Sequence, residues 1–269
     1  MATPPELLRY TSRGCLRLRL HRIRVGSVCC VETGQTPSPR DFASRATCEH
    51  RLPNPIVKGM TSKNLVLTGK HIRLEPLERH HVAELVAAAS GDRVLYQWSP
   101  VPQSKAEAEK YVDTALAWRD AGTAAPYATI RNSDNTFIGS TRFWNIEQWA
   151  WPQGHEFHGR ETPDACEIGY TWLARSAIRT AANSEAKLLM LTHAFETWQV
   201  FRVCLHTDAR NERSRAAIER IGAKFEGILR AHRMAADFIP RDSARFSIIT
   251  AEWPAAKQRL MQLMDRKRD

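Results

Sequence analysis

One stretch, CEIGYTWLARSAIRTAANSEAKLLM, restricts the possible folds more than any other part of the chain. Residues 166–174 have the pattern of a β-strand, and a helix is predicted from about Asn183 to Trp198. The predicted helix carries one apolar stripe, formed by Ala186, Leu189, Met190, Ala194 and Phe195. A strand that runs through a short loop into a long amphipathic helix indicates an α/β chain with this unit at its centre.

The segments around this unit alternate between strand and helix patterns from residue 60 onward. In some segments apolar and polar residues alternate, as in strands. In others the apolar residues have helical spacing, with capping residues such as Ser104 and Gly122 at the ends. Strands are predicted at 71–77, 126–131, 137–144 and 202–208, with a final hairpin at 224–235 and 243–253. Helices are predicted at 79–90, 104–122 and 211–222. This order predicts one mixed α/β domain.

The N-terminal part of the chain differs from the rest in charge and texture. Residues 1–59 contain ten Lys and Arg and four acidic residues, which gives them +6 of the chain's net charge of +10. Six of the 14 prolines also lie there. We therefore divide the chain into a basic, disordered extension at 1–59 and a folded domain at 60–269. The alternatives for 1–59 are a transit peptide, a nucleic-acid-binding arm, or a gene start placed upstream of Met60.

Cysteine usage and hydropathy indicate a cytoplasmic protein. The six cysteines form no CxxC pair and have no zinc-ligand spacing, and no apolar run approaches the length of a membrane span. They are Cys15, Cys29, Cys30, Cys48, Cys166 and Cys204. His155 and His158 lack helical ligand spacing and a third distant ligand, so no metal cofactor is expected. The nearly balanced charge of residues 60–269 makes nucleic acid an improbable partner.

The loop at 175–183 has chemistry suited to a phosphate. The first turn of a helix offers free backbone N–H groups and the positive end of the helix dipole, which together bind a pyrophosphate. Arg179, Thr180 and Ser184 add a cation and hydroxyl groups. The alternative is that Ala181–Asn183 only open the helix, with Asn183 as an ordinary N-cap.

Two segments in sequence, EIGYTWLARSAIRTAANSEAKLLMLTHAFE and RVCLHTDARNERSRAAIERIGAKFEG, resemble the GNAT superfamily of acetyl-CoA-dependent N-acetyltransferases. The resemblance is greatest to the ribosomal-protein N-terminal acetyltransferase branch and covers about residues 65–255. It implies a GNAT-like acyl-CoA N-acyltransferase fold with a twisted mixed sheet and helices on both faces. The sheet is expected to splay between the fourth and fifth predicted strands, and acetyl-CoA to bind in the splay.

The resemblance also implies a set of cofactor-binding residues. The family loop reads Gln/Arg-x-x-Gly-x-Gly/Ala, and the matching positions here are Ile178, Ala181 and Asn183, which depart from it. Ala181 in place of glycine is expected to weaken binding, because glycine allows a close backbone approach or a positive φ. The expected acetyl-CoA contacts are Trp172, Leu173, Arg179, Thr180, Ala181, Ala182, Asn183, Ser184, Asn211 and Ser214. For Asn211, helix capping is a compatible alternative.

Catalysis requires a proton acceptor for the substrate amine and donors for the oxyanion. Glu167 is the candidate base or water-orienting group, with a surface carboxylate as the alternative role. His206 and Asp208 are weaker candidates. Many family members have a tyrosine that protonates the departing thiolate seven residues after the position of Asn211, where this chain has Ile218. Ser214 is therefore the candidate general acid.

Other aromatic and histidine residues are candidates for the acceptor side of the site. Trp98 and Trp144 are expected to flank it as core or pocket wall. The long connection at 145–165 could line an acceptor pocket. Its candidate residues are Trp149, Trp151, His155 and His158.

These features predict an acetyl-CoA-dependent N-acetyltransferase that transfers the acetyl group directly to a primary amine. The acceptor is a protein N-terminus or a small molecule, and the sequence does not choose between them. The alternatives are a noncatalytic acyl-CoA-binding or sensing module, and a nucleic-acid-binding protein that uses the basic arm. The sequence does not decide whether the protein is a monomer or a homodimer.

Overall fold

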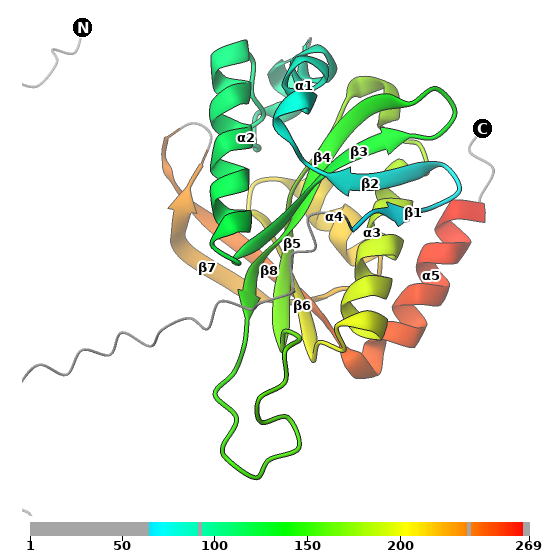
Figure 1. Ribbon diagram of the computed structural model, residues 1–269. Coiled ribbons are helices and arrows are strands. Elements are labelled where there is room, and N and C mark those ends of the chain that lie inside the picture. The colour runs from blue at the N-terminus through cyan, green and yellow to red at the C-terminus, as the bar shows by residue number, and fades with distance from the viewer. Residues whose placement is uncertain (1–64, 91–92, 236–237, 266–269) are drawn as a thin grey trace, which may run out of the picture. The chain divides into compact units, whose positions relative to one another are not determined.

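The computed structural model of the protein describes residues 65–90, 93–235 and 238–265 (Figure 1). The predicted boundary between the extension at 1–59 and the domain at 60–269 lies outside these residues. No helix in the described part of the chain is long and apolar enough to cross a membrane.

The strands of the described residues form one mixed sheet with the order β1-β2-β3-β4-β5-β6-β8-β7. They are β1 (Leu67–Thr68), β2 (Ile72–Pro76), β3 (Ala124–Arg131), β4 (Thr136–Glu147), β5 (Ala165–Leu173), β6 (Arg202–Asp208), β7 (Lys224–Met234) and β8 (Pro240–Ile249). Neighbouring strands are antiparallel except β5 and β6, which are parallel. Two parallel strands must be joined by a crossover connection, and the helix predicted after residue 183 lies in the connection between β5 and β6.

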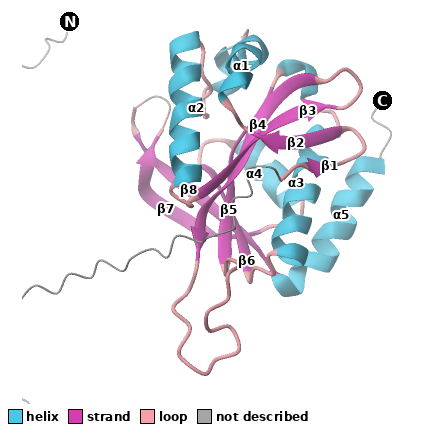
Figure 2. Cartoon of the chain, in the orientation of Figure 1, coloured by secondary structure: helices cyan, strands magenta, loops and turns pink. Residues whose placement is uncertain are grey.

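Helices cover both faces of the sheet, as Figure 2 shows. The main helices are α1 (Val82–Ala89), α2 (Lys105–Asp120), α3 (Ala182–Thr192), α4 (Glu212–Arg220) and α5 (Trp253–Asp265). Apolar residues of α1 and α2, including Leu85 and Val112, form one core with Ile130 of β3. Residues of α3 and α5, including Met190 and Leu260, form the second core on the opposite face.

Local sequence signals place several of these elements. Ile72 and Leu74 of β2 are buried, as the alternation of that strand predicts. The Ser104 side chain accepts a hydrogen bond from the Glu107 N–H at 3.2 Å, so the predicted N-cap of α2 is confirmed. Gly122 follows the same helix with φ 71°, a conformation in which glycine costs little.

The sheet opens between β5 and β6. The two strands pair only from Ala165–Glu167 to Arg202–Cys204, and β5 then continues to Leu173 without a β6 partner. A β-bulge in β5 lies at the start of this separation, where Tyr170 adopts φ 52°. Because a bulge bends its strand and increases the twist, it directs β5 away from β6. The predicted splay between the fourth and fifth strands is confirmed.

One local prediction was wrong. The strand expected to continue to residue 253 ends at Ile249, a short 3-10 turn follows at Thr250–Glu252, and helix α5 begins at Trp253. The helix predicted from about Asn183 to Trp198 is confirmed as α3, which continues into a π-helical turn at His193–Thr197. The short strand β1 was not expected. A recognisable signal for α5 was present: Pro254 in its first turn, then buried Ala256, Leu260 and Leu263 at helical spacing.

Candidate active site

The gap between β5 and β6 exposes strand backbone that has no partner strand on that side. Trp172 and Leu173 pair with Ser140 and Gly139 of β4 on their other side. The Tyr96 hydroxyl donates a hydrogen bond to the Leu173 carbonyl at 3.1 Å. Backbone groups of β5 that face the gap can therefore bind an extended polar chain such as a pantetheine arm.

The loop from β5 to α3 positions the first turn of that helix beside the gap. Arg179 adopts φ 62°, an uncommon conformation for a side chain larger than glycine, whereas Ala181 has φ −68°. A positive φ is therefore not the reason why glycine would be expected at position 181. Helix α3 begins at Ala182, and the Ala182 N–H donates a hydrogen bond to Thr180 Oγ1 at 3.2 Å.

The N-cap of α3 is Ala181, so the alternative role of Asn183 as N-cap was wrong. Ala181 provides no side-chain cap, and the first intrahelical hydrogen bond of this turn is from the Glu185 N–H to the Ala181 carbonyl, at 2.9 Å. The N–H groups of Asn183 and Ser184 consequently have no intrahelical acceptor. Together with the helix dipole, they are suited to a pyrophosphate.

Glu185, which the sequence did not single out, fixes this helix end to the sheet. Its carboxylate accepts backbone hydrogen bonds of 2.7 and 2.8 Å from Lys70 and His71 in the turn before β2, and one of 2.8 Å from Ile72, the first residue of β2. The side chain is 2% exposed. Its charge is thus engaged by the turn and the first turn of α3 keeps a defined position relative to β5.

Helix α4 begins on the other side of the gap. The Asn211 side chain accepts a hydrogen bond from the Ser214 N–H at 3.0 Å, so Asn211 does cap this helix. Ser214 is half-buried, and Ile218 one turn later lies in the core. The loop before α2 reaches this helix start, since the Trp98 ring lies 4.4 Å from the Arg210 guanidinium.

Glu167 lies at the point where β5 and β6 separate, and it is 2% exposed. Arg233 of β7 donates hydrogen bonds of 3.0 and 3.3 Å to its carboxylate, and Asn145 donates another at 3.1 Å. His206 Nδ1 is 3.0 Å from Glu167 Oε2. Burial raises the pKa of Glu167, but the hydrogen bonds and charges of His206 and Arg233 outweigh it and lower the pKa to about 2. The alternative role as a surface carboxylate was wrong.

His206 is placed on β6 just beyond the last residue paired with β5. Its side chain is 6% exposed, and neither ring nitrogen has a hydrogen-bond partner among the described residues, so Nδ1 contacts Glu167 only at ion-pair distance. The His206 ring centroid lies 5.3 Å from that of His232. A carboxylate beside Nδ1 favours the tautomer with the proton on Nδ1. Nε2 is then the nitrogen that can accept a proton.

A buried lysine lies on the α3 face of the gap. Lys187 Nζ donates a hydrogen bond of 2.8 Å to Thr171 Oγ1, which is itself 2.8 Å from Thr141 Oγ1. The residue is 6% exposed, and burial lowers the pKa of Lys187 to about 7. The sequence signal was a lysine inside the predicted amphipathic helix, where it could equally have faced solvent.

The predicted cofactor residues of β5, the following loop and α3 lie in one continuous segment of the chain. Helix α4, which follows β6, begins on the other side of the gap. Within the described residues, no contact joins Glu167 directly to Ser214. The aromatic residues of the β4–β5 connection pack on one another and on Phe201. Trp149 stacks on Phe201 at 5.4 Å, Trp151 stacks on His155 at 4.4 Å, and His158 Nδ1 is 2.9 Å from the Trp151 carbonyl oxygen.

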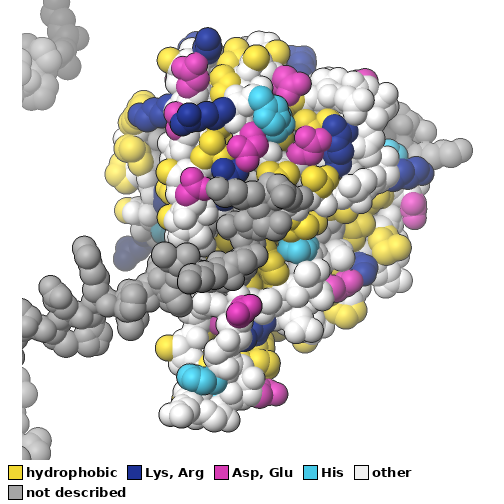
Figure 3. Space-filling view, in the orientation of Figure 1, with side chains coloured by type: hydrophobic (Ala, Val, Ile, Leu, Met, Phe, Trp, Pro, Cys, Tyr) yellow, Lys and Arg dark blue, Asp and Glu magenta, His cyan; other side chains and the backbone are white. Residues whose placement is uncertain are grey.

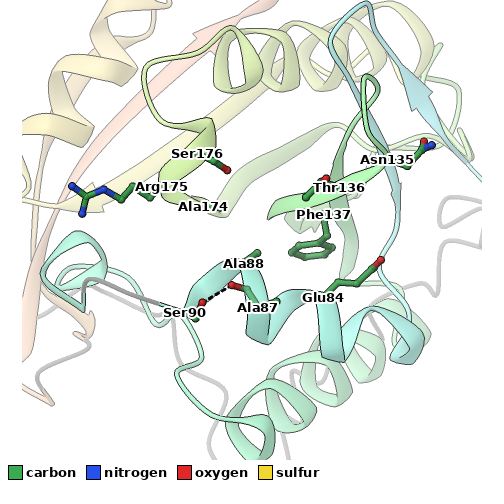
Figure 4. A pocket seen from close by; sticks show the side chains of 10 residues that line it. All are labelled: Glu84, Ala87, Ala88, Ser90, Asn135, Thr136, Phe137, Ala174, Arg175 and Ser176. Carbon is green, nitrogen blue, oxygen red and sulfur yellow. Dashed lines mark hydrogen bonds between the residues drawn. The ribbon is translucent and has the colours of Figure 1, made fainter.

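A separate pocket of about 550 Å³ lies between α1, the β3–β4 turn and the segment after β5 (Figure 4). Glu84, Phe137 and Arg175 are among its lining residues. None of the predicted catalytic or cofactor residues lines it. Figure 3 shows acidic and basic side chains interspersed over α1 and α2, a distribution unlike the one-sign patch that binds nucleic acid.

Comparison with known proteins agrees with this architecture. The family profile described as "Acetyltransferase (GNAT) domain" matches residues 71–224. The chain is 26% identical over 191 residues to "Putative ribosomal N-acetyltransferase YdaF" of Bacillus subtilis, covering 68% of this chain and 92% of that protein.

Solved structures share the fold. A GCN5-related N-acetyltransferase from Brucella melitensis aligns with a TM-score of 0.63 and 28% identity, covering 75% of this chain and 86% of that one. RimJ of Mycobacterium smegmatis, solved with CoA-disulfide, aligns with a TM-score of 0.59 and 22% identity, over 73% and 90% of the two chains. The chain belongs to the GNAT acetyltransferase family, and it is an N-acetyltransferase.

Proposed function

We propose that this protein transfers the acetyl group of acetyl-CoA to the α-amine of a protein N-terminus, in the cytoplasm. The observation that carries the proposal is the gap between β5 and β6, bordered by unpartnered strand backbone and by the first turn of α3. The protein acceptor is supported by the relative named as a ribosomal N-acetyltransferase.

The residues present fit acetyl-CoA. The N–H groups of Asn183 and Ser184, with Arg179 and Thr180 beside them, would hold the pyrophosphate, and Trp172 and Leu173 would bind the pantetheine arm. Asn211 and Ser214 on α4 would face the thiol end. Acetyl-CoA supplies an activated thioester carbonyl when bound.

In this arrangement the incoming ammonium loses its proton to His206 Nε2. Glu167 holds the opposite ring nitrogen, and because its pKa is about 2 it stays ionised and orients His206 rather than serving as the base itself. A β5 backbone N–H would stabilise the oxyanion, and Ser214 or water would protonate the leaving thiolate. His206, the weaker sequence candidate, thereby takes the role first assigned to Glu167.

The test is an acceptor screen with the full chain, acetyl-CoA and peptides that differ in their first residue. Release of free CoA and an acetyl mass increase on the peptide are measured, with a peptide whose N-terminus is blocked as the control. We expect acetylation of free N-termini only. Binding of CoA without transfer to any amine would instead favour the noncatalytic module, and absence of CoA binding would refute the proposed cofactor site.

A further inference from the structure

Arg142 is a buried cation without an anion. It lies in the middle of β4 and is 1% exposed. Its guanidinium carbon is 4.1, 4.8 and 5.4 Å from the ring centroids of Tyr170, Tyr111 and Trp118. Nε and Nη2 are buried and have no hydrogen-bond partner. Cation–π contacts account for its position, but they leave these N–H donors unused.

A second buried arginine, Arg119, has the carboxylate partner that Arg142 lacks. Arg119 of α2 is 8% exposed and forms an ion pair with Glu78. Nowhere in the described ranges does a carboxylate lie within ion-pair distance of Arg142, and nearby Glu167 is already engaged by Arg233 and His206. A buried charge that lacks a partner is costly, so an unpaired guanidinium requires a specific explanation.

Arg142 is placed next to the opening of the sheet. It pairs with Gly169 of β5, just beyond Glu167, where β5 leaves β6. Adjacent strands are about 4.8 Å apart, so Arg142 is one strand away from the edge of the gap. It lies on the face covered by α2, opposite the face where Lys187 contacts Thr171.

The residues around Arg142 add a further unused donor. Trp144, two positions along the same face of β4, pairs with Glu167, and its buried Nε1 has no hydrogen-bond partner. The rings over Arg142 are half-buried, so each keeps part of its surface open to solvent. Tyr111 packs against the core formed with α1 and α2, and its hydroxyl forms a long, 3.4 Å hydrogen bond to Ser140. A ligand that complements these donors must supply acceptor oxygens and negative charge.

We propose that Arg142 binds a carboxylate of the acceptor, so that this enzyme prefers amines that carry a carboxylate on the same residue. This inference rests on the proposed function, because it places the acceptor amine at the gap. Tyr111 moves aside as the carboxylate enters, and Trp144 Nε1 donates to the same group. Two sources have this chemistry: the side chain of an acidic first residue, and the α-carboxylate of a free amino acid.

The experiment measures binding and transfer separately. Calorimetry with the full chain and CoA compares peptides that begin with Asp and Asn, or with Glu and Gln, on one common tail. Free glutamate and its α-amide form a second arm that identifies the source of the carboxylate. The rate of acetylation with acetyl-CoA is then measured for the same set.

We expect the acidic member of a pair to bind about tenfold or more tightly than its amide, and Arg142→Met to abolish that difference. Arg142→Lys, which keeps the charge but not the paired donors, is expected to retain only part of it. Arg230→Met, at an exposed arginine of β7, is the matched control and should keep the full preference. Equal binding of the acid and amide members by the wild type would overturn the inference.

Thermal unfolding distinguishes this role from a structural one. Replacing an unpaired buried guanidinium by Met should leave the melting temperature unchanged or higher, whereas Arg119→Met should lower it by leaving Glu78 unpaired. An equal fall in both variants, with the acid preference intact, would make Arg142 a structural residue and refute the inference. Acid-selective binding without transfer would refute the proposed function and leave this inference standing.

Discussion

Glu167 of β5 and His206 of β6 face each other where their strands separate, with Oε2 and Nδ1 3.0 Å apart. The two side chains come from segments that share no local sequence relationship. Their contact places an imidazole nitrogen at the edge of the gap, on the face that also carries Arg142.

Replacing Glu167 by Gln should lower kcat by about 10- to 100-fold through misorientation of His206, with little change in the KM for acetyl-CoA. His206→Asn should lower kcat at least as far, and the double variant no further, because the two residues act as a unit. Steady-state kinetics of the three variants check this. Additive losses would contradict the pairing.

The same carboxylate gives a pH signature in stability. Because the folded pKa of Glu167 is lowered to about 2, its stabilising contribution is present above its unfolded pKa and is lost as the pH falls towards 2. The difference in free energy of unfolding between wild type and Glu167→Gln should therefore shrink from pH 5 to pH 2. Denaturant titrations across this range measure it, and a constant difference would refute the assigned ion pairs.

Lys187 should show the opposite trend. Its folded pKa is lowered to about 7 by burial, so below that pH the folded state holds a buried ammonium, and the penalty disappears as the pH approaches the unfolded pKa. Lys187→Met should stabilise the protein by a few kcal/mol at pH 7 and by progressively less towards pH 10. Lys110→Met, at an exposed position of α2, is the control and should show no such trend.

Gly139 is required where β4 passes β5. A Cβ on Gly139, which has φ 155°, would lie 2.2 Å from the Trp172 carbonyl oxygen, so Gly139→Ala must push the two strands apart. We expect a loss of more than about 2 kcal/mol in stability. Gly154→Ala is the control, because it has φ 87° but nothing within 4 Å of its Cβ, and it should cost about 1 kcal/mol.

Glu185→Ala should lower stability by about 3 kcal/mol, because three backbone N–H groups lose their acceptor. It should also weaken CoA binding, since the first turn of α3 loses its attachment to the turn before β2. Glu212→Ala, at an exposed first-turn residue of α4, serves as the control for helix-end charge. Calorimetric titration with CoA and denaturant unfolding report the two effects, and unchanged CoA affinity in Glu185→Ala would show that this attachment is not needed.

Part of the site could be predicted because its signals are local. The strand at 166–174, the following loop and the amphipathic helix lie in one continuous segment, so their order alone places a helix end beside a strand end. The role of Asn211 as a cap was likewise readable from its position before α4. His206 was noticed on its strand, but its importance depends on Glu167, a contact between separate strands.

The sequence by itself determined the order of elements, the amphipathic faces and the β–loop–α unit, because periodicity and capping act over a few residues. Only the tertiary structure decided where β5 leaves β6, which carboxylate holds His206, and that Arg142 is buried without an anion. Those features depend on strand register and on the Tyr170 bulge, which arise from pairing between distant segments. Local patterns carry no record of such partners, so burial and charge pairing had to come from the folded chain.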